Sequence, residues 1–196
     1  NFRTSCLGQL SGTYSVGGTP GPNNYPTLDS LIDNMNACGI NGAVTVNLNG
    51  GTHAGFKLAD VDGMSATNNI TINGSVAGDS IVANIGMAID LDGASHVTLN
   101  NMYIETQGAS NSYAIWMHNG ANSINITNNT IVANSATTIS TVGGVVGSDL
   151  STNVFSYGDN AKNVTVTGNS IMGGYIGLIV NGLSTALHNE GVTVQD

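Results

Sequence analysis

A short motif of alternating apolar and polar residues recurs along the chain. It occurs five times, at residues 69–74, 96–101, 123–128, 163–168 and 191–196, with an apolar residue in its second and fourth positions. Successive copies are 27, 27, 40 and 28 residues apart. Alternation with a period of two is typical of a strand that buries one face. The motif therefore predicts five strands in a repeat with one insertion.

Two further strands are predicted in each repeat. Three copies continue through Asn or Gly into a second apolar segment, at residues 100–104, 127–131 and 167–171. Asn and Gly tolerate left-handed backbone angles, so we expect a tight corner there. A third strand precedes each copy, at residues 88–92, 114–118, 144–148 and 176–180. Three short strands per coil predict a solenoid whose equivalent strands pair in parallel, about 4.8 Å apart.

The first 43 residues carry a different pattern. Over residues 27–38, the apolar side chains fall on one helical face, with Thr27 as the N-cap and Gly39 as the stop. We expect this amphipathic helix to cap the solenoid, because terminal repeats need a cover. The predicted organisation is an N-terminal segment with a capping helix at 1–43 and parallel coils at 44–196. The last copy stops before its Asn corner, which predicts an open end that continues into a longer β-helical protein.

Composition narrows the classes of function. Only 8% of the 196 residues are charged, against about 25% in ordinary globular proteins, whereas Gly and Asn each number 27. With three Lys and Arg residues and a net charge of −9, the chain cannot neutralise a phosphate backbone, which excludes nucleic acid as a partner. No apolar run is long enough for membrane insertion.

The two cysteines, Cys6 and Cys38, are too few for a disulfide scaffold and match no zinc pattern. They predict one disulfide near the N-terminus, the alternative being two separate buried thiols. A disulfide, few Lys residues and many Asn and Thr residues favour a secreted or cell-surface location.

The segment Tyr-Pro-Thr-Leu-Asp-Ser-Leu-Ile at 25–32, followed by Val-Thr-Val at 44–46 and Gly-Thr-His at 51–53, resembles the entry to the pectin-lyase-like β-helices. The repeated Asn-x-[Val/Ile]-Thr-[Val/Ile]-x-[Asn/Gly]-Asn-x-Ile is similar to the coil repeat of that superfamily, so the resemblance covers residues 25–196. It implies an all-β solenoid: a right-handed, single-stranded parallel β-helix of three sheets with an N-terminal amphipathic capping helix. Right-handedness also follows the general preference of parallel crossovers.

Residues 10–18, Leu-Ser-Gly-Thr-Tyr-Ser-Val-Gly-Gly, extend the resemblance to segments of very large secreted surface proteins of gliding and marine Bacteroidota. That resemblance implies an adhesin or filament component. In enzymes of the superfamily, the strands that precede the motif form the first sheet, which is the floor of a polysaccharide cleft. The resemblance therefore points to the outer face of this sheet as the place to look for chemistry.

Candidate site residues lie on that face. Asp90 and Asp92 alternate with inward apolar residues, as do Trp116 and His118, and Lys57 is expected one coil below Asp90. Carboxylates at i and i+2 are about 6.6 to 6.8 Å apart at the backbone. That separation overlaps the range of about 6.5 to 9.5 Å for the acid and base of an inverting glycosidase.

Asp90 and Asp92 are thus catalytic candidates, and Trp116, His118 and Lys57 are ligand-binding candidates, with Trp116 as a platform for a sugar face. The alternative is a solvated pair of acids, a weak surface ion pair between Lys57 and Asp90, and a Trp that covers a groove or meets a neighbouring domain.

The sequence lacks the motifs of the enzymes in this superfamily, which favours a module without catalytic activity. Pectate lyases use a basic residue with acidic calcium ligands, whereas the basic residues here are only Arg3, Lys57 and Lys162. The Asn-Thr-Asp, Asp-Asp and Gly-His-Gly segments of polygalacturonases are missing, as is the Arg beside two Asp of pectin methylesterases. We therefore expect a non-catalytic extracellular β-helix module that contacts glycans or proteins and further β-helical domains of the same polypeptide. The alternative is a polysaccharide lyase or an inverting glycoside hydrolase.

No cofactor is expected, with calcium as the one possibility. Asp60 and Asp62 stand in a loop whose spacing loosely resembles a calcium loop, although the later Glu ligand is missing. The alternative is that both are ordinary turn acids.

Overall fold

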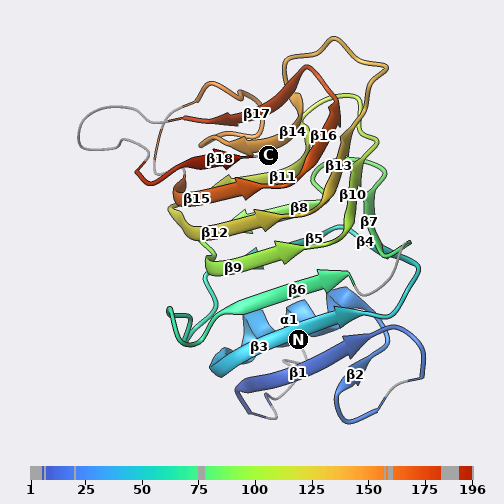
Figure 1. Ribbon diagram of the computed structural model, residues 1–196, viewed down its shortest axis with the longest axis vertical. Coiled ribbons are helices and arrows are strands. Elements are labelled where there is room, and N and C mark those ends of the chain that lie inside the picture. Colours follow the sequence, from blue (N-terminus) through green and yellow to red (C-terminus); the bar gives the residue numbers. More distant parts are fainter. Residues whose placement is uncertain are drawn as a thin grey trace, which may run out of the picture.

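The computed structural model describes residues 6, 8–19, 21–74, 78–156, 158, 161–181 and 190–195. Residues 1–5, 7 and 20 of the N-terminal segment, and Asp196 of the last motif, lie outside the described residues. The strands form three parallel sheets wound into a right-handed parallel β-helix, as predicted (Figure 1). Among the residues described, no helix has the length and apolarity that a membrane crossing needs.

Three sheets run along the helix axis. Sheet A has eight strands: β1 (Leu10–Val16), β2 (Asn24–Tyr25), β3 (Ile40–Leu48), β6 (Ile70–Gly74), β9 (Ser95–Asn100), β12 (Ala121–Thr127), β15 (Ala161–Thr167) and β18 (Thr193–Gln195). Sheet B has five strands: β4 (Thr52–Ala54), β7 (Ser80–Ala83), β10 (Tyr103–Thr106), β13 (Thr130–Ala133) and β16 (Ser170–Gly173). Sheet C has five strands: β5 (Phe56–Ala59), β8 (Ile89–Asp92), β11 (Ser112–His118), β14 (Val142–Gly147) and β17 (Ile176–Val180).

The repeated motif forms the strands of sheet A in register. Val97 pairs with Ile70 on one side and with Ile124 on the other, and Ile124 pairs in turn with Val164. Equal positions of successive motifs therefore lie next to one another. The 40-residue spacing does not disturb this register, because its extra residues lie between strands, a few between β13 and β14 and most between β14 and β15.

Tight corners join sheets A and B where Asn and Gly predicted them. Asn101, Asn128 and Gly168 have φ of 58°, 57° and 64°, the left-handed conformation that these residue types tolerate. A second left-handed column was not predicted: His96 and Ser123 have φ of 53° and 57° near the start of their strands. Asn163 and Gly191 occupy the same motif position with φ of 51° and 64°, and these two residue types were the signal available in the sequence.

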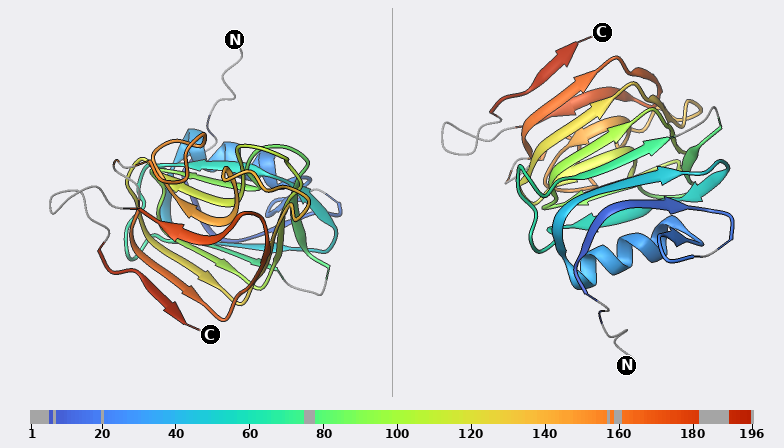
Figure 2. Two further views of the ribbon diagram at one scale, coloured as in Figure 1. Left: turned by 90° about the horizontal axis from the view of Figure 1, so that it is seen from above. Right: turned by 60° about the horizontal axis from the view of Figure 1, so that its bottom comes forward.

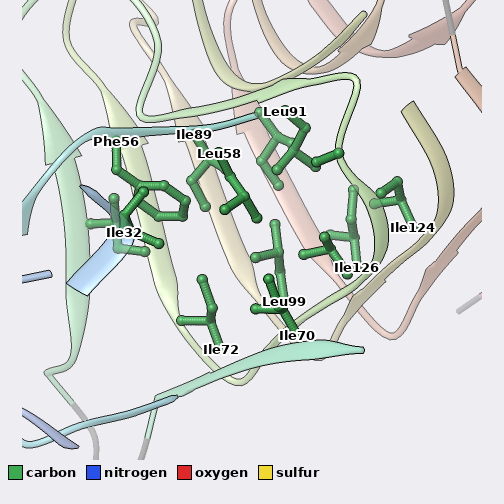
Figure 3. Packing of buried hydrophobic residues seen from close by; sticks show 14 of the residues in the cluster. Ile32, Phe56, Leu58, Ile70, Ile72, Ile89, Leu91, Leu99, Ile124 and Ile126 are labelled. Carbon is green, nitrogen blue, oxygen red and sulfur yellow. The ribbon is translucent and has the colours of Figure 1, made fainter. Parts of the chain in front are cut away.

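The core is one column of hydrophobic side chains, nearly all of them aliphatic, between the sheets. Figure 3 shows Ile70, Ile72, Leu99, Ile124 and Ile126 of sheet A facing Phe56, Leu58, Ile89 and Leu91 of sheet C. All nine are buried. Full burial of such a side chain stabilises the folded state by about 1.5 to 3 kcal/mol, so stacked coils stabilise one another mainly through this column.

Helix α1 (Leu28–Cys38) lies across the N-terminal end of the coils (Figure 2). The Thr27 hydroxyl accepts a hydrogen bond from the backbone N–H of Ser30 at 3.3 Å, and Gly39 ends the helix with a φ of 75°. The buried face of the helix consists of Leu28, Leu31, Ile32 and Met35, the residues expected from the helical spacing.

Asn36 of α1 covers the edge of sheet C. Its side chain donates to the Lys57 carbonyl at 3.0 Å and accepts from the Ala59 N–H at 3.1 Å. These are two hydrogen bonds to the exposed edge of β5, which would otherwise be an open template for another strand.

Strand β1 was not anticipated. It pairs in parallel with β3, Thr13 opposite Thr45 and Val16 opposite Leu48, and so extends sheet A beyond the first coil. Ser11, Thr13 and Ser15 alternate with Leu10, Tyr14 and Val16, and only Gly12 interrupts the apolar positions, so this alternation was the signal available in the sequence. Cys6 and Cys38 are joined in a disulfide with Cα atoms 5.4 Å apart, which ties the chain ahead of β1 to the end of α1.

A buried amide supports the corner between sheets A and B. The Asn129 side chain accepts from the Met102 N–H at 3.0 Å and donates to the Leu99 carbonyl at 2.9 Å and to Asn169 Oδ1 at 3.0 Å. These hydrogen bonds link three successive coils, and Asn129 is 2% exposed.

Replacing this amide should destabilise the fold. Asn129→Ala leaves a buried donor and a buried acceptor unpaired, which should lower the free energy of unfolding by about 2 to 4 kcal/mol in urea denaturation. Asn125→Ala is the matched control on the exposed face of β12 and should cost about 0.5 kcal/mol or less. Equal losses in the two variants would contradict a special role for the corner amide.

Candidate functional site

Sheet C brings the predicted site residues together on its outer face. Lys57 of β5 stands opposite Asp90 of β8, which stands opposite Trp116 of β11, and Asp92 stands opposite His118. The neighbours Leu58, Leu91 and Met117 are buried in the core. Alternation therefore places the five candidates outward in three adjacent strands. We call Lys57, Asp90, Asp92, Trp116 and His118 the sheet C cluster.

The contacts within the cluster run diagonally, contrary to the expected pair between Lys57 and Asp90. Lys57 Nζ contacts Asp92 Oδ2, one pleat further along the strand. The Asp90 carboxylate is instead taken by His118, whose Nε2 lies 2.8 Å from Asp90 Oδ1. His118 Nδ1 lies 3.7 Å from Asp92 Oδ1, so both ring nitrogens face carboxylates.

Asp92 is held in its charged form. Burial raises the pKa of its carboxyl, whereas hydrogen bonds from Lys57 and from Nδ2 of Asn119 lower it. Nearby positive charge adds to the lowering, so the pKa of Asp92 lies below its ordinary value of 3.8. The hydrogen bond to Asp92 likewise raises the pKa of Lys57, against the opposing effect of partial burial. Both groups are therefore ionised at neutral pH.

The indole of Trp116 stacks on another ring with one face and donates a hydrogen bond through its nitrogen. The Trp116 and His118 rings are stacked with centroids 3.6 Å apart and planes 11° apart. Nε1 donates to the carbonyl of Ser148 at 2.9 Å and lies 3.2 Å from its hydroxyl. The predicted sugar platform is thus part of an internal stack that links β11 to the end of β14.

A second, smaller apolar cluster covers part of the outer face of sheet C. Tyr113, Val146 and Val154 are buried together, and Trp116 packs against them. Val154 belongs to the insertion after β14, and the Tyr113 hydroxyl donates to the carbonyl of Ser151 in the same insertion at 2.7 Å. Burial raises the pKa of Tyr113 to about 12. The insertion therefore folds over the outer face of sheet C, which is the face on which the family resemblance predicts a polysaccharide cleft.

Sequence reasoning missed this second cluster. Strict alternation with Ile115 and Met117 assigns Tyr113 to the core, but Ala114 and Ile115 are both core residues and Tyr113 packs outside. The adjacent apolar pair Val145 and Val146 was the available signal, because one of two consecutive strand residues must face outward.

Asp60 and Asp62 lie away from the sheet C cluster. Both are exposed in the turn after β5, on either side of buried Val61. The Asp62 carbonyl accepts from the N–H of Ile40, which joins this turn to the start of β3. Across the described part of the chain, no three or more His, Cys, Asp or Glu side chains gather in an arrangement that could hold a metal ion.

One buried imidazole lies outside the cluster. His53 of β4 is 9% exposed, and its Nε2 has no hydrogen-bond partner among the described atoms. Burial lowers the pKa of His53, and the charge of Asp79 opposes that effect. The imidazole is therefore kept neutral in the first coil.

A groove of about 430 Å³ lies between α1 and β5. Asp29 and Asp33 of the helix and Lys57 of the strand line it, together with Asn36 and Phe56. Neither Asp90 nor Asp92 is among its lining residues, so this hollow does not open onto the pair of carboxylates.

No protein-family model matches the chain, and no curated protein or solved structure does so either. The architecture of three parallel sheets is therefore established by the structure, and the candidate function rests on the site geometry and on the resemblance given above.

The charge on Asp92 should make stability depend on pH. Because its pKa is lowered by folding, its contribution is complete above pH 3.8 and is lost as the pH falls through the folded pKa. Asp92→Asn should cost about 1 kcal/mol in urea denaturation at pH 7 and much less at pH 2. Asp60→Asn, in an exposed turn, is the control. A cost for Asp92→Asn that is the same at both pH values would contradict this account.

Proposed function

We propose that the chain is a stiff, non-catalytic β-helix module of an extracellular cell-surface protein, related to the pectin-lyase-like superfamily. The observation that carries the proposal is that the two candidate carboxylates are bound to partners within the protein. Asp92 is held by Lys57 and Asn119, and Asp90 by His118.

Glycoside hydrolysis by the inverting route needs one carboxyl that stays protonated near neutral pH and another that activates water. Hydrogen bonds and positive charge lower the pKa of Asp92, which is the opposite of what a general acid needs. The stack of Trp116 on His118 likewise uses an aromatic face that a bound sugar would need. These contacts favour a structural role for the sheet C cluster.

A parallel β-helix is suited to act as a spacer. Each coil contacts only its neighbours and adds about 4.8 Å of length, so a long, narrow body is built from local contacts. The outward positions of sheet A bear Thr and Asn, including Thr45, Thr71, Thr98 and Asn125, which keep the surface polar with few charges. An adhesin or filament component, contacting glycans or proteins through its faces, is the role this construction supports.

A polysaccharide lyase or hydrolase is the second candidate. One observation favours it: Asp90 and His118 form a hydrogen-bonded pair of acid and base types on the outer face of the sheet that holds the cleft in the enzymes. In that case Asp90 and Asp92 would be the catalytic groups.

The two candidates differ in turnover. The purified chain should release no unsaturated or reducing-end product from a panel of acidic and neutral polysaccharides, with or without calcium. Asp90→Asn and Asp60→Asn should give the same baseline. Product release that is lost in Asp90→Asn, retained in Asp60→Asn and accompanied by unchanged thermal unfolding would contradict the module and establish an active site on sheet C.

A further inference from the structure

The inward column of sheet B changes residue type in the first coil. The register places His53 of β4 beside Ile81 of β7, and the column continues through Ile104, Ile131 and Ile171. Four successive coils therefore carry isoleucine where the first coil carries histidine. The first coil thus introduces a titratable group at a position that the other coils fill with an aliphatic side chain.

No hydrogen bond satisfies the buried nitrogen of this imidazole. His53 is 9% exposed, and its Nε2 has no partner among the described atoms. Helix α1 contacts β4, and the buried face of that helix is entirely apolar. On the other side, the register neighbour of His53 is the aliphatic Ile81. A proton on Nε2 would therefore create a buried charge without a hydrogen bond, which is strongly unfavourable.

One charged group acts on the imidazole from the described residues. Asp79, directly before β7, is 1% exposed, and its charge favours protonation of His53. Its carboxylate also accepts a hydrogen bond from the N–H of Gly50, in the turn that leads to β4. The acidic residues of α1, Asp29 and Asp33, are exposed and line the groove beside β5 instead. Burial outweighs the charge of Asp79, so the pKa of His53 lies below its ordinary value of 6.5.

Acid therefore opposes closure of this end of the solenoid. When α1 and β4 are released, His53 is in water and takes up a proton as the pH falls through 6.5. In the closed form it takes up a proton only at a lower pH, so the closed form loses stability between these two values. In that interval, each fall of one pH unit favours the released form by up to about tenfold.

We infer that His53 makes the N-terminal end of the solenoid an acid-sensitive closure, in which protonation of the imidazole releases β4 and α1 from the first coil while the coils from β10 onward stay folded. The release stays local because each coil contacts only its neighbours, and the later positions of this column are isoleucine. The released form uncovers the edge of β5, which Asn36 of α1 covers in the closed form. This device goes beyond the proposed function and holds whether or not sheet C is catalytic.

Residue-resolved hydrogen–deuterium exchange by NMR can test this. The Ala59 amide donates to Asn36 of α1, and the Ser80 amide donates to the carbonyl of Gly51 ahead of β4, so both report release. From pH 7.5 to pH 5.0, the protection factors of these two amides should fall at least fivefold. The Thr130 amide, which donates to Met102 between later coils, should change less than twofold.

His53→Ile extends the isoleucine column into the first coil and should abolish this acid response. His96→Asn is the matched control, because it removes a histidine from sheet A and keeps a residue type that tolerates the φ of 53° at this position. It should respond to acid like the wild type. An acid response that persists in His53→Ile would overturn the inference, as would an equal fall in protection at Thr130, because acid would then loosen the whole stack.

The wild-type chain provides a second measurement that does not depend on the folding of a variant. In an NMR titration, the imidazole of His53 should gain its proton below pH 6.5, over the same interval in which Ala59 and Ser80 lose protection. Protonation of His53 at or above pH 6.5, or protonation without any loss of protection at these two amides, would contradict the closure.

Discussion

The structure depends on parallel pairing that sets equal positions of successive coils about 4.8 Å apart. Each side chain must therefore pack next to the side chain at the equivalent position of the adjacent coil. Aliphatic residues repeat inside, and uncharged Thr and Asn repeat outside, because stacked like charges would repel along the whole sheet. The low charge content of 8% follows directly. Sheet C is the exception, since Lys57 contacts Asp92 and His118 contacts Asp90 across adjacent strands, so that groups of opposite type meet.

The same constraint explains how much of the fold could be predicted. Period-two alternation located the strands, their buried faces and their register, and Asn or Gly marked the corners at residues 101, 128 and 168. Prediction failed where the chain leaves the repeat. Strand β1 precedes the repeat, and its alternation of apolar and polar residues is interrupted at Gly12. Tyr113 turns outward because Ala114 and Ile115 both enter the core.

The sequence predicted which residues make up the candidate site, but not which of their side chains contact one another. Alternation placed Lys57, both Asp residues, Trp116 and His118 on one face, and the structure brings them together there. The partner of each carboxylate depends on how far the side chains reach across the pleat. The observed contacts are diagonal, with Lys57 bound to Asp92 and His118 bound to Asp90. The insertion that covers Tyr113 is a long-range contact with no periodic signal. These two features turn a face that resembles a cleft floor into one whose polar groups are largely bound to one another.

Stabilisation by neighbouring coils is the central claim, and hydrogen–deuterium exchange resolved by strand tests it most directly. Amides of β10, β11 and β12 lie between two coils and should exchange slowly, as should those of β5, whose edge Asn36 covers. Amides on the outer edges of β16 and β17 should exchange fastest among the strands of sheets B and C. Exchange in β16 and β17 as slow as in β10 and β11 would contradict the account, because strands with a described neighbour on one side only would then be as stable as strands between two coils.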